Sequence, residues 1–217
     1  MIICHRINRS NELSLIPARF GVEVDVRHDN RTDRLYLSHD PGSGQDLEEY
    51  LSAFRHRHII FNIKEAGIER RCIELAEKFR ISRDDYFLLD VEFPYVYRAC
   101  GYADRDAIRA NRSRRDQFVH SIAVRFSEAE PIEQAIRLQG LVDWLWMDTN
   151  TVLPYSPDLA STFRLFRVCL VCPERWGRPQ DIPLYARILR DANVPLDAVM
   201  TNIAHAEQWE RIGYFTV

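Results

Sequence analysis

The chain has 217 residues, of which 46% are hydrophobic and 28% are charged, the composition of an ordinary globular domain. Its 29 basic and 32 acidic residues give a formal net charge of −3, so no overall positive field attracts it to nucleic acid or to an anionic membrane. We therefore expect one domain over residues 1–217 that acts on a small molecule, with any phosphate binding confined to a local site.

The cysteines are odd in number and lie in apolar segments, which argues against a disulfide framework and favours a reducing, cytoplasmic location. They are Cys4, Cys72, Cys100, Cys169 and Cys172. The first apolar run begins at Ile2 without a charged leader or a cleavage site, and no long apolar stretch follows. We expect neither a signal peptide nor a membrane span, and the sequence leaves the oligomeric state unknown.

Short apolar runs rich in β-branched and aromatic residues alternate with helical patterns along the chain. The runs predict strands at residues 2–4, 22–26, 59–63, 86–89, 122–124, 144–147, 168–172 and 198–201. The helical patterns cover residues 46–57, 68–80, 131–138, 157–166, 182–191 and 205–212. Strict alternation of this kind predicts a parallel sheet.

Eight strands in 217 residues leave roughly 27 residues for each strand and helix unit, the scale of a compact single-domain (β/α)8 TIM barrel. An open doubly wound sheet is the alternative, but it usually has fewer strands at this length and a glycine-rich first turn. The first turn here reads His5-Arg6-Ile7-Asn8. The barrel is therefore the predicted fold.

The longest connection, between the fourth and fifth strands, carries an arginine-rich stretch over residues 104–116. Such a run can clamp a substrate phosphate, or it can be a solvated helix or an insertion. The second interpretation is the one we expect.

Active sites of this barrel lie where the strands end, so polar residues there are the candidates. His5 ends the first strand, and Glu23 and Asp25 lie two apart on the second, on one face and roughly 7 Å apart. Two adjacent carboxylates repel each other, and a shared divalent cation relieves that repulsion most simply.

His39 follows a short extended segment and begins a loop, and Asp40 comes directly after it. A lone histidine at such a position is usually structural. With His5 on the other side of the acidic strand, however, the two imidazoles form a pair that can take a proton from an attacking hydroxyl and give one to a leaving oxygen. Asp40 either orients an imidazole or only caps the turn.

Two later strands carry further polar residues. Asn62 and Lys64 share one face of the third strand. Lys64 is predicted to contact a phosphate or to pair with Glu23, Asp25 or Glu65, and Asn62 to ligate a cation or to hydrogen-bond Glu23.

Arg125 ends the fifth strand and offers two parallel donors to a phosphate, although pairing with Glu128 or Asp148 is an equal alternative. Trp146 and Asp148 share a face of the sixth strand, where we expect the tryptophan to be core.

These pieces, His5-Arg6, Glu23-x-Asp25 and His39-Asp40, resemble the His-Arg, Glu-x-Asp and His-Asp pattern of the glycerophosphodiester phosphodiesterase family. That family belongs to a superfamily with phosphatidylinositol-specific phospholipase C. Asn62-Ile63-Lys64 is similar to its acid-x-Lys strand, and the closing Val199-Met200-Thr201-Asn202 is similar to its last strand.

The resemblance implies a (β/α)8 barrel with His5 and His39 as the general acid and base. It also implies Glu23 and Asp25 as ligands of Mg²⁺ or Ca²⁺, and Lys64, helped by Arg6, as the phosphate contact. The chain differs from the pattern at two positions, because Ile7 replaces the usual glycine and Asn62 replaces the third acidic ligand.

The sequence thus predicts a divalent-metal-assisted phosphodiesterase that acts on a small soluble phosphodiester, with Mg²⁺ or Ca²⁺ as cofactor. Two alternatives stay open: a barrel that binds a phosphate ligand without turnover, and a metal-independent phosphodiester lyase.

Overall fold

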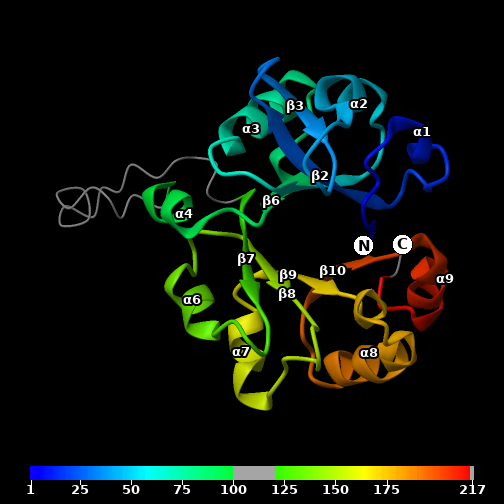
Figure 1. Ribbon diagram of the computed structural model, residues 1–217. Helices are drawn as coiled ribbons and strands as arrows, with labels where there is room; N and C mark the ends of the chain where they lie inside the picture. The colour runs from blue at the N-terminus through cyan, green and yellow to red at the C-terminus, as the bar shows by residue number, and fades with distance from the viewer. Residues whose placement is uncertain (100–120, 216–217) are drawn as a thin grey trace.

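The computed structural model describes residues 1–99 and 121–215, which form a mixed α/β structure with one ten-stranded sheet. Figure 1 shows the helices arranged around the outside of the strands. The strands are β1 (Ile2–Cys4), β2 (Gly21–Asp29), β3 (Arg34–Leu37), β4 (Gln45–Asp46), β5 (His58–Ile63), β6 (Tyr86–Leu89), β7 (Ala123–Phe126), β8 (Trp144–Met147), β9 (Arg167–Val171) and β10 (Leu196–Thr201).

Each helix follows a strand in the chain, directly or after a connecting segment. They are α1 (Ser10–Leu13), α2 (Leu47–Ala53), α3 (Glu69–Lys78), α4 (Phe93–Ala99), α6 (Ile132–Arg137), α7 (Ala160–Phe163), α8 (Ile182–Asp191) and α9 (Ile203–Ile212). The described residues also include four short 3-10 helices: η1 (Arg83–Asp85), η3 (Pro157–Leu159), η4 (Pro173–Trp176) and η5 (Pro179–Asp181).

Eight strands pair in parallel in the order β6-β5-β2-β1-β10-β9-β8-β7. The two ends of this row, β6 and β7, meet through one isolated parallel bridge between Leu88 and Ile122 rather than through a continuous ladder. The row therefore bends back on itself, but its hydrogen-bonded ladder is interrupted at this point.

β3 and β4 make the sheet mixed, because β3 pairs antiparallel with the outer half of β2 and β4 pairs antiparallel with β3. This hairpin was not predicted from the sequence, which indicated strict alternation. The pairing of Val26 with Leu37 begins where the parallel pairing of β2 with β5 ends. The long strand β2 thus pairs with β5 along its first part and with β3 along its second part.

Alternating residues of the strands separate two hydrophobic clusters. Val22, Val24 and Val26 of β2 face the helices, as predicted, and belong to the larger cluster. The smaller cluster comes from the opposite strand faces and contains Ile3, Ile60, Phe87, Leu89, Ala123, Trp144, Trp146, Cys169, Val171, Ala198 and Met200. Glu23 and Asp25 are on the same side of β2 as this inner cluster.

His58 begins β5 and is fully buried at the inner cluster. Its ring centroid lies 5.4 Å from those of both Phe87 and Trp144. Burial, followed by the positive charge of Arg167, lowers the pKa of His58 to about 3. The imidazole is therefore neutral in the folded protein at ordinary pH.

Most predicted elements occur within a few residues of their expected bounds, and the strands at residues 2–4, 86–89 and 144–147 match them fully. The helix expected over residues 157–166 was wrong as one element, because the chain forms η3 and then α7. The arginine-rich stretch 104–116 and Cys100 lie outside the described residues.

Four cysteines in the described part of the chain are buried free thiols, as expected. Within residues 1–99 and 121–215, no helix has the length and apolar character needed to cross a membrane. The expected single domain and the cytoplasmic location stay predictions.

The loop that joins β3 to β4 carries His39, and Gly44 lets it close. A Cβ atom at Gly44 would overlap the backbone carbonyl of Leu37, the residue at which β3 ends. We predict that Gly44→Ala lowers the free energy of unfolding by about 1–3 kcal/mol, because backbone has to move to relieve the overlap. Ser43→Ala, in the same exposed loop, is the control and should change it by less than about 0.5 kcal/mol. Equal stability of the two variants in urea unfolding would contradict this role.

Candidate active site

A cavity of about 400 Å³ lies at the carboxyl ends of the parallel strands, the end at which barrel enzymes bind substrates. Every one of the eight parallel strands, or the residue that follows it, contributes to the lining. The contributions are His5 after β1, Glu23 of β2, Asn62 of β5, Leu89 of β6, Arg125 of β7, Trp146 of β8, Val171 of β9 and Met200 of β10. Arg6, Asp90, Asp148, Arg175 and Trp176 complete it.

Glu23 is the buried acid of this cavity, with 1% of its surface exposed. The backbone N–H of Arg6 donates to its Oε2 at 2.7 Å, and the Asn62 side-chain amide donates to its Oε1 at 2.9 Å. Of the two predictions for Asn62, the structure therefore shows the hydrogen bond to Glu23. The Oδ1 atom of Asn62 is buried and has no hydrogen-bond partner among the described residues.

Asp25 is equally buried but is not among the residues that line the cavity. Its Oδ2 accepts a hydrogen bond from Asn8 Nδ2 at 2.8 Å, and Lys64 Nζ lies 3.1 Å from its Oδ1. The Arg6 guanidinium is more distant, at 4.0 Å. Lys64 thus pairs with Asp25, one of the two roles predicted for it, and it is also outside the lining.

Burial, followed by the nearby charge of Asp25, raises the pKa of Glu23 to about 7. Burial, followed by the charges of Arg175 and Arg6, lowers the pKa of His5 to about 3. His5 Nε2 lies 3.9 Å from Glu23 Oε2, which is too long for a hydrogen bond. Because His5 is neutral near pH 7, this contact is not an ion pair there.

His39 lies at the same end of the sheet but is not in the cavity lining. The backbone N–H of Ser38 donates to the Asp25 carbonyl at 3.0 Å, which places His39 just beyond the acidic strand. Its Nδ1 lies 2.9 Å from Asp40 Oδ1, and 43% of its side chain is exposed. Asp40 therefore contacts the imidazole of His39, which is the contact that the orienting role predicted for Asp40 requires.

Arg125 was predicted to bind a phosphate or to pair with Glu128 or Asp148. Its guanidinium contacts Asp90 at 2.6 Å, Asp148 at 2.8 Å and Glu130 at 2.9 Å. Glu128 was the wrong partner, because it accepts hydrogen bonds from Thr151 instead. Three carboxylates thus neutralise Arg125 and hold it in place.

Sequence reasoning missed Arg175 and Trp176, two residues of η4 that line the cavity beside His5. Arg175 is half-buried and makes no ion pair within residues 1–99 and 121–215. The Trp176 indole donates to Asp148 Oδ1 at 2.9 Å. The available signal was position, since Pro-Glu-Arg-Trp follows directly after a predicted strand.

Two lining residues that are not glycine have left-handed backbone conformations: Arg6 has φ = 55° and Asp90 has φ = 58°. Each follows directly after a strand, β1 and β6 respectively. Such conformations are disfavoured for residues with a Cβ atom, and they gather at functional sites. At Arg6 this turn aims the backbone N–H at Glu23.

The donor chemistry of Glu23, Asp25 and Asn62 fits a hard divalent cation, since all three offer oxygen atoms. The unpartnered, buried Oδ1 of Asn62 agrees with a nearby cation. Within the described residues, however, no group of three His, Cys, Asp or Glu side chains is arranged to hold a metal ion. The fit therefore depends on the amide of Asn62.

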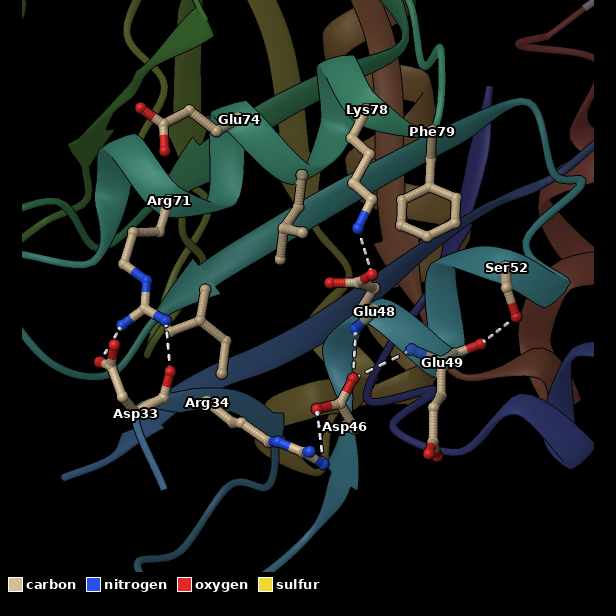
Figure 2. A pocket seen from close by; sticks show the side chains of 12 residues that line it. Asp33, Arg34, Asp46, Glu48, Glu49, Ser52, Arg71, Glu74, Lys78 and Phe79 are labelled. Carbon is tan, nitrogen blue, oxygen red and sulfur yellow. Dashed lines mark hydrogen bonds and ion pairs between the residues drawn. The ribbon is translucent and has the colours of Figure 1, made fainter. Parts of the chain in front are cut away.

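A groove of about 670 Å³ lies between α2, α3 and the start of β3, away from this cavity. Figure 2 shows that Arg71, Lys78 and Arg34 each point toward an acid of the groove. Arg71 lies 2.9 Å from Asp33, and Lys78 pairs with Glu48. Because its basic side chains are paired with acids in this way, the groove is a weaker candidate for an anion site.

Neither any protein-family model nor any curated protein matches this chain at a significant level. The case for a function therefore depends on the residues of the cavity.

The raised pKa of Glu23 depends in part on the charge of Asp25. We predict that Asp25→Asn lowers the pKa of Glu23 from about 7, because the variant removes a repelling charge and leaves Lys64 nearby without its partner. Glu23 would then ionise at a lower pH, as a carboxyl-carbon NMR titration would measure. Asp197→Asn, at the other end of β10, is the control. A Glu23 pKa that stays near 7 in Asp25→Asn would contradict the coupling.

Proposed function

We propose that this chain is a phosphodiesterase with a (β/α)8 barrel fold, which cleaves a small soluble phosphodiester with the help of a divalent cation. The observation that carries the proposal is the gathering of His5, three arginines and a buried carboxylate around one cavity at the carboxyl ends of eight parallel strands.

Three features support the barrel. The parallel order runs from β6 through β1 to β7, and the two ends of that row meet at the bridge between Leu88 and Ile122. The inner hydrophobic cluster is formed by strand faces that point away from the helices. Eight strands that share a lined cavity at one end are the arrangement expected of a barrel mouth.

The cavity suits a compact phosphodiester. Its volume of about 400 Å³ is in the range of small-molecule sites. Arg6 and Arg175 supply positive charge, whereas the carboxylates of Asp90 and Asp148 are engaged by Arg125. The part of the cavity nearest His5 is therefore suited to an anion.

In the proposed reaction, neutral His5 accepts a proton from the attacking hydroxyl, which belongs to water or to the substrate itself. A new P–O bond forms, the bond to the leaving oxygen breaks, and that oxygen takes a proton from His39. A substrate hydroxyl as nucleophile would give a cyclic phosphate first. Arg6 neutralises charge that develops on the phosphoryl oxygens.

Binding of an anionic phosphate next to His5 offsets the positive charges that disfavour its protonated form. The imidazole thus becomes a better base when substrate is present. Asp40 orients the ring of His39 through Nδ1, which leaves Nε2 for the substrate.

Glu23, Asp25 and Asn62 are the residues that would hold Mg²⁺ or Ca²⁺. A cation there would polarise a non-bridging phosphate oxygen. Meanwhile the Arg6 N–H and the Asn62 amide fix the Glu23 carboxylate at the edge of the cavity.

One observation favours a metal-independent version of the same reaction. Lys64 already lies 3.1 Å from Asp25 and neutralises it, so half of the acidic pair has a cationic partner within the protein. In that version Arg6 and the other basic side chains stabilise the phosphoryl charge by themselves. The two versions differ in their response to chelators.

The two-histidine mechanism predicts that His5→Ala and His39→Ala each lower the hydrolysis of bis(4-nitrophenyl) phosphate by about 10²-fold or more, because each loses a proton-transfer step. His205→Ala, on α9, is the matched control and should retain full activity. Full activity in either His5→Ala or His39→Ala would exclude that residue from the chemistry. Folded protein that binds phosphate but shows no turnover would instead indicate a non-catalytic phosphate-binding barrel.

Cation dependence is tested with Asn62→Asp, which restores a third negative charge to the oxygen donors. If a cation assists the reaction, this variant should need less Mg²⁺ or Ca²⁺ for half-maximal activity than the wild type, and a chelator should stop both. Activity that persists in chelator, with no change in Asn62→Asp, would favour the metal-independent version.

A further inference from the structure

Arg175 differs from Arg125, another arginine that lines the cavity. Arg125 is held by Asp90, Asp148 and Glu130, all within 2.9 Å, so its charge is already balanced. Arg175 lines the same cavity, is half-buried, and has no carboxylate partner in the described part of the chain. A half-buried guanidinium without a counter-ion is costly unless a ligand supplies the negative charge.

The backbone around Arg175 is fixed on both sides. Pro173 begins η4, and Gly177 ends it in a left-handed conformation with φ = 73°. The backbone N–H of Arg175 donates to the Cys172 carbonyl at 3.0 Å. The guanidinium is therefore carried by a rigid turn directly after β9.

The neighbours of Arg175 in sequence are engaged elsewhere. Glu174 Oε1 accepts hydrogen bonds from Thr201 Oγ1 and from the backbone N–H of Asn202, so it is directed toward the end of β10. Trp176 donates to Asp148, which is itself held by Arg125. Glu174 is thus committed to other partners, and Trp176 ties the turn to the cavity wall.

We propose that Arg175 is a phosphate-binding residue of this cavity, and that Arg125 instead positions the wall through Asp148 and Trp176. The ligand group is a phosphate ester held between Arg175, Arg6 and the imidazole of His5, all of which line one cavity. The assignment deepens the proposed phosphodiesterase function and rests on it for the identity of the ligand. It moves the second phosphate contact from β7 to the turn after β9.

Arg175 and His5 line the same cavity, so one bound anion can contact both side chains. Two cations and a neutral base around one anion is also the charge pattern that phosphoryl transfer requires.

The test is the affinity of the folded protein for inorganic phosphate, measured by titration calorimetry at low ionic strength in buffer without divalent cations. Arg175→Gln should weaken phosphate binding at least tenfold, because it removes two parallel donors and their charge. Arg175→Lys should weaken it less, because the charge is kept. Arg187→Gln, on the exposed surface of α8, removes the same charge far from the cavity and should change affinity less than twofold.

A melting curve of each variant would show that it is folded, so that a loss of phosphate affinity in Arg175→Gln reports the loss of a ligand contact and not unfolding.

The outcomes separate this inference from the proposed function. Phosphate binding that depends on Arg175, in a protein without diesterase activity, would support the anion site and exclude the phosphodiesterase. Diester hydrolysis that depends on His5, with phosphate affinity unchanged in Arg175→Gln, would support the phosphodiesterase and exclude Arg175 as a phosphate-binding residue. Equal loss of affinity in Arg175→Gln and Arg187→Gln would overturn the inference, since net charge alone would then explain it. Wild-type protein that binds no phosphate would also overturn it.

Discussion

The buried carboxylate of Glu23 is the interaction on which the candidate site depends. It joins three neighbouring strands, because Arg6 at the end of β1 and Asn62 on β5 both donate to it from either side of β2. A buried carboxylate without such donors would be strongly destabilising. The left-handed turn at Arg6 is part of the same arrangement, since it directs that backbone N–H inward. His5, the residue before that turn, is thereby held at the cavity beside the acid.

The arginines of the site are divided between structure and ligand binding, and the division follows from the carboxylates around them. Arg125 is surrounded by three acids from the segments directly after β6, β7 and β8, so it cross-links the half of the sheet in which the ladder is interrupted. Arg175 has acids near it in sequence, but none of the described residues forms an ion pair with it. An arginine's role is thus decided by partners that come from distant segments.

This division also shows how far sequence reasoning reaches. Periodicity located the parallel strands, and the spacing of Glu23 and Asp25 placed both on the inner face of β2, because both follow from local backbone geometry. The hairpin of β3 and β4 was missed, since its pairing partner is the outer half of a strand already assigned to a parallel neighbour. Arg125 was considered as a phosphate contact because sequence reasoning did not identify Asp90 as its partner. Asp90 lies 35 residues away in sequence. Arg175 was overlooked because nothing local distinguishes it from a surface arginine.

His58 makes the stability of the fold depend on pH in the acidic range. The ring is enclosed by Phe87 and Trp144 at the start of β5, and its pKa of about 3 lies well below the ordinary value of 6.5. Above pH 6.5 the folded and unfolded chains both carry this residue neutral, so it makes no difference to their balance. Between about pH 6.5 and pH 3 only the unfolded chain takes up the proton, and each step of acidification favours unfolding. The aromatic packing that makes this imidazole a good core residue at neutral pH therefore lowers the stability of the fold in acidic surroundings.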